Sequence, residues 1–317
     1  MDELDLLEIS KLYNPVITTG TFDGLHLGHR KVLSETIRIA KKYNGNPVVL
    51  TFWPHPRHVL GKGDFSLLNT LEERKELFKK MGIKHIYVQL FNKEFSSLSS
   101  ADYVKEILVD KLRVKVLVVG YDHQFGKERS GKFDTLGLLA TQFDFKLEQV
   151  QVLDMEGMNI SSTKIRHALE IGNLSFANQM LGYDYFINGK VIDGHKKGRE
   201  LGYPTANLEL SDSLKMIPKD GIYAVNVCVK EKFYKGMLSI GFRPTFPDQP
   251  HIRTVEVNIF DFNEEIYNQN ITVYLIERLR DEVKFSNIDE LKNQMAMDKI
   301  NSLKILKSSP QFSERLM

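Results

Sequence analysis

The chain has 317 residues, which is enough for two ordinary domains with a hydrophobic core each. Its formal net charge of +2 provides no broad basic surface, which argues against a nucleic-acid-binding role. The single cysteine, Cys228, excludes an internal disulfide, and no apolar run approaches the roughly 20 residues of a membrane span. Residues 1–5 are acidic, unlike a secretion signal, and we expect a cytoplasmic protein without membrane partners.

Up to about residue 160, short β-branched runs alternate with helical patterns. The predicted strands are Val16–Thr19, Val48–Phe52, His85–Gln89, Val114–Val119 and Leu147–Val152. One predicted helix spans Leu71–Met81, with Thr70 and Glu73 as its capping box. This alternation predicts a parallel sheet covered on both faces, with ligands bound beyond the carboxyl ends of the strands.

After about residue 182, apolar residues alternate with period two. The predicted strands there include Tyr223–Val229, Val255–Ile259 and Ile271–Leu275. Short strands with Gly and Pro turns favour an antiparallel barrel or a sandwich, here followed by one terminal helix over Ile288–Leu306. A helical bridge is expected at 162–182, so the predicted domains are 1–182 and 183–317.

The first candidate site is the segment GTFDGLHLGH, which begins at Gly20 and leads from a strand into a helix. Gly20, Gly24 and Gly28 allow the backbone to approach a phosphate closely. His26 and His29 lie at the helix start, where free N–H groups favour an anion and imidazoles can donate to charge developing on phosphate. Helix-capping histidines and a His-x-x-His metal pair are the alternatives.

A second segment, ISSTKIR at 160–166, supports the same site. Ser162, Thr163, Lys164 and Arg166 offer hydroxyls and positive charge to a triphosphate at another helix start. Alone, this segment is more simply interpreted as a capped surface helix.

A third segment, HKKGRELGYPTAN at 195–207, indicates a different phosphate site. Gly198 and Arg199 belong to a basic loop that could cover phosphates, and Pro204 fixes the backbone before Thr205 and Asn207. The side-chain oxygens of those two residues suit Mg²⁺. An ordinary turn is the alternative interpretation.

Glu256 interrupts an apolar strand pattern in a segment that is otherwise short of acids. A carboxylate there could deprotonate an alcohol that attacks ATP. The alternative is an outward-facing glutamate on an exposed barrel face.

The first half resembles the nucleotidylyltransferase superfamily through Gly-x-Phe-Asp-Gly followed by His-x-Gly-His. With the segments at 51–57, 120–126 and 160–166, it is similar to the adenylyltransferase module of the prokaryotic bifunctional riboflavin kinase/FAD synthetase family. The resemblance implies transfer of AMP from ATP to FMN. It further implies nucleotide contacts by Gly20, Phe22, Gly24, Gly28, Ser162, Thr163 and Arg166, catalytic roles for His26 and His29, and flavin contacts by Asp122 and Phe125. Trp53, where the family often has Asp, and His123, where Phe is usual, depart from its pattern.

The second half resembles the riboflavin kinase module of the same family, through the segments at 198–207, 221–224, 241–246 and 279–285 and through Glu256. The resemblance implies that Thr205 and Asn207 bind Mg²⁺ with the ATP phosphates near Gly198 and Arg199. It assigns Glu256 as the base on the ribityl 5′-hydroxyl and Arg280 to flavin or nucleotide. Ser239, where the family often has Asn, is a departure.

We therefore expect an enzyme that phosphorylates riboflavin to FMN and then adenylylates FMN to FAD, releasing pyrophosphate. Its ligands would be riboflavin, FMN and ATP, with Mg²⁺ in both steps. One alternative is an enzyme with a single active module. Another is a flavin-binding regulatory or storage protein. The sequence leaves the oligomeric state open.

Overall fold

The computed structural model describes residues 9–61, 63, 65–121, 133–151, 154–155, 158–193, 202–242 and 253–308. The chain divides into two compact units, Met1–Ser162 and Thr163–Met317. The predicted helical bridge is present as α8 (Ser162–Glu170) and α9 (Leu174–Leu181). Both helices fall almost entirely in the second unit, where the Asn178 side chain binds the Leu275 carbonyl. The functional boundary at 182 stays a prediction.

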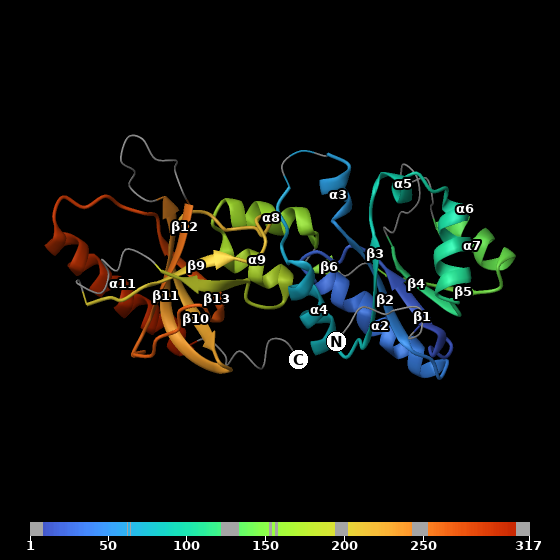
Figure 1. Ribbon diagram of the computed structural model, residues 1–317, viewed down its shortest axis with the longest axis horizontal. Coiled ribbons are helices and arrows are strands. Elements are labelled where there is room, and N and C mark those ends of the chain that lie inside the picture. Colours follow the sequence, from blue (N-terminus) through green and yellow to red (C-terminus); the bar gives the residue numbers. More distant parts are fainter. Residues whose placement is uncertain are drawn as a thin grey trace. The chain divides into compact units, whose positions relative to one another are not determined.

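The first unit contains a five-stranded sheet in the order β3-β2-β1-β4-β5 (Figure 1). All neighbouring strands are parallel, as predicted. The strands are β1 (Val16–Thr19), β2 (Pro47–Trp53), β3 (His85–Leu90), β4 (Val116–Gly120) and β5 (Lys146–Val150). A separate two-stranded sheet pairs β6 (Asp154–Met155) with β7 (Met158–Asn159). Strand β1 is central and fully buried. The loop that follows it therefore lies at the carboxyl ends of the strands, in the middle of the sheet.

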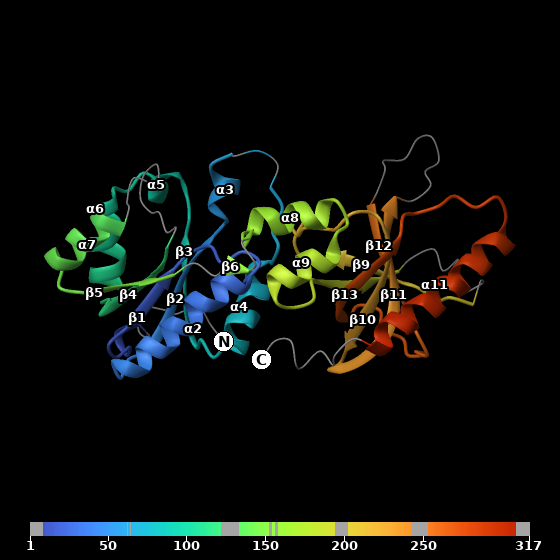
Figure 2. The same cartoon turned by 180° about the vertical axis from the view of Figure 1, so that it is seen from behind.

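Helices cover both faces of this sheet. Helix α2 (Leu27–Lys42) packs Ile39 and Ala40 against Val16 and Val118, and Figure 2 shows it along that face. The π-helix η1 (Tyr103–Lys111) and α7 (Phe133–Gln142) share the core on the other face. Further helices of the unit are α3 (Pro56–Val59), α4 (Leu71–Lys80), α5 (Lys93–Ser96) and α6 (Ser100–Asp102).

The predicted capping box at the start of α4 is confirmed. The Thr70 hydroxyl accepts the N–H of Glu73 at 3.2 Å, and the Glu73 carboxylate accepts the N–H of Thr70 at 3.0 Å. These two bonds satisfy backbone donors that a helix start otherwise leaves without partners. They therefore fix the point at which the chain enters α4.

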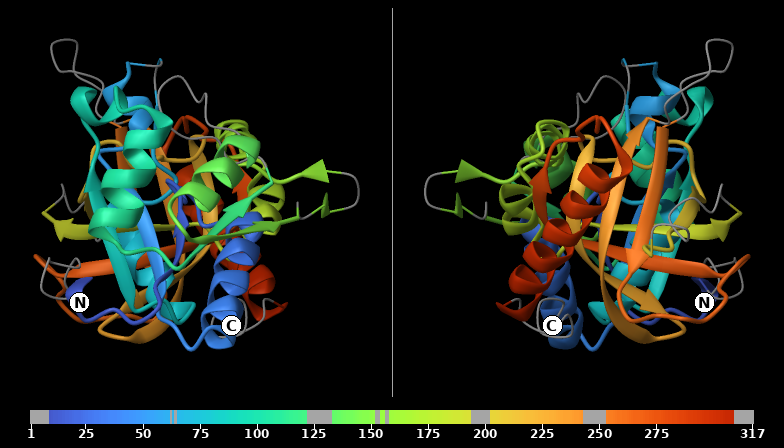
Figure 3. Two further views of the ribbon diagram at one scale, coloured as in Figure 1. Left: turned by 90° about the vertical axis from the view of Figure 1, so that its right-hand side faces the viewer. Right: turned by 90° about the vertical axis from the view of Figure 1, so that its left-hand side faces the viewer.

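The second unit is a closed barrel in the order β10-β11-β12-β9-β8-β13, which decides between the predicted barrel and sandwich. Its strands are β8 (Phe186–Ile192), β9 (Ala206–Leu210), β10 (Gly221–Val229), β11 (Lys232–Phe242), β12 (Arg253–Ile259) and β13 (Asn270–Arg280). The terminal helix α11 (Ile288–Ser308) packs on β10, β11 and β13 (Figure 3). No helix in the described ranges is both long and apolar enough to cross a membrane.

Candidate active sites

The first site is built on the tight turn between β1 and α2. Phe22, Gly24 and Leu25 all adopt positive φ, at 49°, 85° and 36°. Gly24 meets this requirement without steric cost, since it has no Cβ. The turn lies at the carboxyl end of the central strand, which is where parallel sheets of this kind bind ligands.

His26 is the N-cap of α2. Its Nδ1 accepts the N–H of His29 at 3.3 Å, so a neutral imidazole carries its proton on Nε2. His26 can therefore cap the helix through Nδ1 and still donate to a phosphate through Nε2, so the two interpretations given above are compatible. A Cβ added at Gly28 would come within 3.2 Å of the His26 ring, so a larger residue at 28 would press on the imidazole.

His29 lies in the first turn of α2 and stacks on His26, with ring centroids 3.6 Å apart. Its Nδ1 is buried and has no hydrogen-bond partner within the described part of the chain. Burial, followed by His26 and Arg74, holds the pKa of His29 well below its usual value. His29 is therefore neutral at pH 7 and can offer one donor nitrogen to an anion.

Asp23 connects the turn to two later segments. Its carboxylate accepts the N–H groups of Leu68 at 3.2 Å and Asn69 at 3.0 Å, just before α4. Its carbonyl accepts the Ser162 hydroxyl at 2.8 Å, which brings that predicted site residue to the turn. Thr163 and Arg166 follow in α8, exposed and half-buried, and their predicted nucleotide contacts remain predictions.

Some predicted site residues lie outside the described ranges. These are Asp122, Phe125, Gly198 and Arg199, and the departure His123 is another. Arg74 was missed by the sequence reasoning. Although it is charged, it is fully buried in the first unit, and its Nη1 donates to the Thr21 carbonyl within the turn. Only its place within an amphipathic helix was visible in the sequence, so no pattern there marks it.

The second site is built where β9 meets β12. Glu256 pairs directly with Asn207 across the two strands, and the Thr205 hydroxyl donates to Glu256 Oε2 at 3.3 Å. The two predicted metal ligands and the predicted base therefore lie together. Glu256 is half-buried, between the buried Val255 and Val257.

Asn258 is a further residue of this site that the sequence reasoning missed. It lies two residues after Glu256 on β12, it is buried, and its Nδ2 donates to the Pro204 carbonyl at 2.6 Å. This bond holds the backbone just before Thr205 against β12. An asparagine within an alternating strand is the only signal that could have identified it.

One row of paired residues crosses five neighbouring strands of the barrel. Asn207 pairs with Glu256, Glu256 with Ser239, Ser239 with Ile222, and Ile222 with Arg280. Directly paired residues share a face of a sheet, so the predicted metal ligand, base and flavin residue lie along one line. The departure Ser239 is the direct neighbour of the predicted base.

Arg280 is anchored to the terminal helix. Its guanidinium donates to both carboxylate oxygens of Asp298, the shortest distance being 2.6 Å, and its Nη1 donates to the Asp281 carbonyl at 2.9 Å. Asp298 is buried and Arg280 is half-buried, so salt screens this pair less than it would an exposed one. The side chain is held in place at one end of the row, and its ligand contacts remain a prediction.

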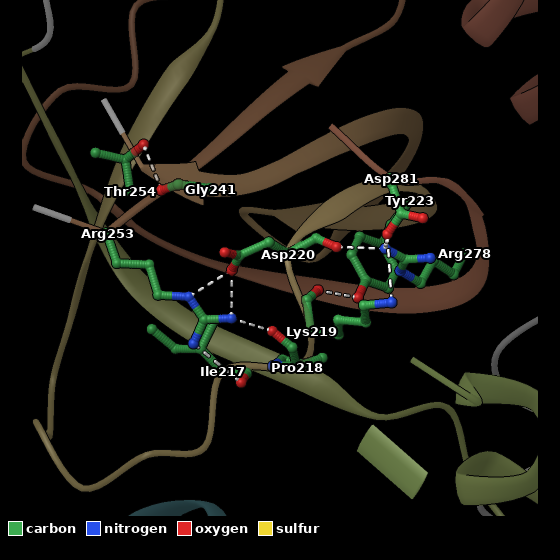
Figure 4. A network of polar contacts seen from close by, with 10 residues as sticks. All are labelled: Ile217, Pro218, Lys219, Asp220, Tyr223, Gly241, Arg253, Thr254, Arg278 and Asp281. Atoms are coloured by element: carbon green, nitrogen blue, oxygen red, sulfur yellow. Dashed lines mark hydrogen bonds and ion pairs between the residues drawn. The ribbon is translucent and has the colours of Figure 1, made fainter. Parts of the chain in front are cut away.

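A polar network holds the segment at 217–220, before β10 (Figure 4). The Arg253 guanidinium binds the Asp220 carboxylate at 2.6 Å and the carbonyls of Ile217 and Pro218. The Arg278 guanidinium binds the Asp220 carbonyl from the neighbouring strand. Arg253 is the first residue of β12, and Arg278 lies two residues before the end of β13 at Arg280. The network therefore ties these parts of both strands to the segment before β10.

The chain matches two family models in succession. The FAD synthetase model matches residues 8–164, and the riboflavin kinase model matches residues 181–306. The first match ends early in α8 and the second begins at the end of α9, so most of the helical bridge lies between them. Each contains one of the two sites described above.

Whole proteins with the same order of modules are similar to this chain. The bifunctional riboflavin kinase/FMN adenylyltransferase of Bacillus subtilis is 39% identical over 297 residues, covering 91% of this chain and 92% of that protein. The protein of the same description from Escherichia coli K12 is 34% identical over 290 residues, covering 90% and 91%.

A solved structure described as a macrolide-efflux protein from Streptococcus pneumoniae is 32% identical, with a TM-score of 0.83 and coverage of 93% of this chain and 96% of that one. Both bifunctional proteins are more than one-third identical to this chain over at least nine-tenths of each sequence. The two sites described above follow one another in the same order as the two family models. The chain therefore belongs to the family of bifunctional riboflavin kinase/FMN adenylyltransferases.

Proposed function

We propose that this protein makes FAD from riboflavin in two ATP-dependent steps. The second unit transfers the γ-phosphoryl group of ATP to riboflavin and forms FMN. The first unit then joins FMN to the AMP part of a second ATP and releases pyrophosphate. Membership of the bifunctional family supports both activities, and the presence of a separate site in each unit supports their assignment.

The observation that carries the kinase step is the Thr205–Glu256–Asn207 cluster. In the proposed step Glu256 takes the proton of the attacking hydroxyl, which in riboflavin is the terminal ribityl alcohol. Its Oε2 is held by the Thr205 hydroxyl, so the carboxylate is oriented before substrate binds. We assign Glu256 as the general base of this step.

A Mg²⁺ ion fits the same cluster. The available donors are the Thr205 hydroxyl, the Asn207 amide oxygen and the Glu256 carboxylate, which are the hard oxygen ligands that Mg²⁺ prefers. We propose that Thr205 and Asn207 hold the ion with the ATP phosphates. When bound, it would neutralise charge on the transferring phosphoryl group.

The adenylyl-transfer step is assigned to the turn between β1 and α2. The N–H groups at the start of α2 attract the triphosphate, and His26 Nε2 is a donor because Nδ1 is engaged in the cap. His29 is a neutral second donor. Such donors stabilise the negative charge that grows on the α-phosphate as FMN attacks and pyrophosphate leaves.

The experiment that tests this function is a time course of the purified protein with riboflavin, ATP and Mg²⁺, with the flavins separated by chromatography. FMN should rise first and then decline as FAD accumulates, and chelation of Mg²⁺ should stop both steps. FMN that persists would show a protein with only the kinase step active, and binding of flavin without turnover would show a regulatory or storage protein.

We also propose that the protein works in the cytoplasm, where ATP is available for both steps.

A further inference from the structure

Arg74 is the largest side chain that is completely buried in the described part of the chain. It lies in α4, and its Nη1 donates to the Thr21 carbonyl at 2.5 Å and to the Thr51 hydroxyl at 3.1 Å. Its Nε and Nη2 atoms are buried without a hydrogen-bond partner in the ranges that the structure describes. Burying a guanidinium in this way is costly, because its charge and the three N–H bonds on Nε and Nη2 lose water without full replacement.

The charge of Arg74 is only partly balanced by its surroundings. Burial lowers the pKa of Arg74, while the Asp23 carboxylate opposes that effect from a distance. The Asp23 oxygens meanwhile accept backbone N–H groups of Leu68 and Asn69. An arginine stays protonated even with a lowered pKa, so a positive charge remains in a setting of low dielectric.

This charge lies directly behind the turn of the first site. Thr21, whose carbonyl Arg74 holds, is the second residue of the GTFDGLHLGH segment. The same guanidinium acts on His29 and lowers the pKa of that histidine. Trp53, the last residue of β2, lies over the guanidinium with its ring centroid 5.7 Å from Cζ.

We propose that Arg74 is a positioning residue of the adenylyl-transfer site, with two effects. Its Nη1 holds the turn that presents N–H groups to the phosphates, and its buried charge strengthens the attraction of those groups for the anion. The guanidinium is covered, so it acts through the turn and does not touch the ligand. The proposal rests on the adenylyl-transfer function of the first unit and adds a residue to it.

The test uses inorganic pyrophosphate, the product that the first unit releases. Trp53 is the only tryptophan in the chain, so its fluorescence reports on this site and not on the barrel. Arg74→Gln removes the charge, and Arg74→Lys keeps it. We expect Arg74→Gln to weaken pyrophosphate binding roughly ten- to a hundredfold and to slow FAD formation from FMN, whereas Arg74→Lys should stay within roughly threefold of wild type.

Arg113→Gln is the matched control. The Arg113 guanidinium also donates to backbone carbonyls of the first unit, those of Ile9 and Ser10. Arg113 is exposed, however, and it precedes β4, so it lies at the amino ends of the strands and not at their carboxyl ends. Its loss should change neither pyrophosphate binding nor FAD formation. FMN formation from riboflavin should be unchanged in every variant, because the barrel carries that step.

Several results would overturn the proposal. They are wild-type pyrophosphate affinity in a folded Arg74→Gln protein, equal losses in Arg74→Gln and Arg74→Lys, or no pyrophosphate binding to the wild type. If Arg74→Gln does not fold, as judged by urea unfolding, Arg74→Lys decides: retained affinity supports the charge, and lost affinity refutes it. Failure of the wild type to form FAD from FMN would refute the proposed function instead, and the pyrophosphate comparison would still decide on Arg74.

Discussion

At the scale of single residues, His29 connects the packing of the first site to its chemistry. Burial of its imidazole and the nearby His26 and Arg74 side chains all lower the pKa of His29, so each disfavours the charged ring. We expect His29→Ala to reduce FAD formation from FMN by roughly 10²–10³-fold, the usual loss for one donor to a developing charge. Chromatography should then show FMN accumulating from riboflavin at the wild-type rate. Undiminished FAD synthesis would remove His29 from the mechanism.

The same histidine makes the stability of the first unit depend on pH. Its folded pKa lies well below the ordinary 6.5 of the unfolded chain. Between those two values the unfolded state binds the extra proton, so the free energy of unfolding should rise with pH and level off above about 6.5. Urea unfolding followed by Trp53 fluorescence measures this slope. It should flatten in His29→Ala, and a slope unchanged in that variant would assign the dependence to other groups.

In the barrel, the residue that we propose for the chemistry is Glu256, the general base of FMN formation. Its carboxylate is held by Thr205 and paired with Asn207. We expect Glu256→Gln to lower FMN formation by roughly 10²–10⁴-fold, because the amide cannot accept the substrate proton. FAD formation from supplied FMN should persist. Glu209→Gln, on the exposed face of β9, is the control and should leave both rates unchanged. Equal loss of both steps in a folded Glu256→Gln protein would contradict the two-site assignment.

At the scale of secondary-structure elements, the cap of α4 fixes the support of the first site. The capping box at Thr70 starts the helix that carries Arg74. We expect Thr70→Ala to lower the free energy of unfolding of the first unit by about 1 kcal/mol, because the Glu73 N–H loses its acceptor. Thr141→Ala, which removes an exposed hydroxyl bonded within α7, should change it far less. Urea unfolding reported by Trp53 separates the two outcomes.

Strand pairing explains why the second site needs no long motif. The row from Asn207 to Arg280 draws one residue from each of the five successive strands β9 to β13. Sequence reasoning identified Asn207, Glu256 and Arg280 but could not place them in one line. Their alignment depends on the register between strands, which long-range packing decides.

At the scale of the whole molecule, the two steps should be separable within one chain. A mixture of Glu256→Gln and His29→Ala proteins contains one active site of each kind, on different molecules. We expect this mixture to convert riboflavin to FAD, because FMN released by one variant can bind to the other. FMN that accumulates without FAD, although each variant retains its own step, would show that FMN does not pass between molecules.

The two-part organisation, the parallel sheet and the family could all be predicted from the sequence, because hydrophobic periodicity and motif spacing are local properties of the chain. The same motifs predicted site roles for His26, His29, Thr205, Asn207 and Glu256. Only the folded chain distinguishes the barrel from a sandwich, shows that His26 Nδ1 caps α2, and brings Arg74 and Asn258 to the two sites. Those features depend on burial and on contacts between distant segments, such as the 53 positions between Arg74 and Thr21, and no local pattern encodes them.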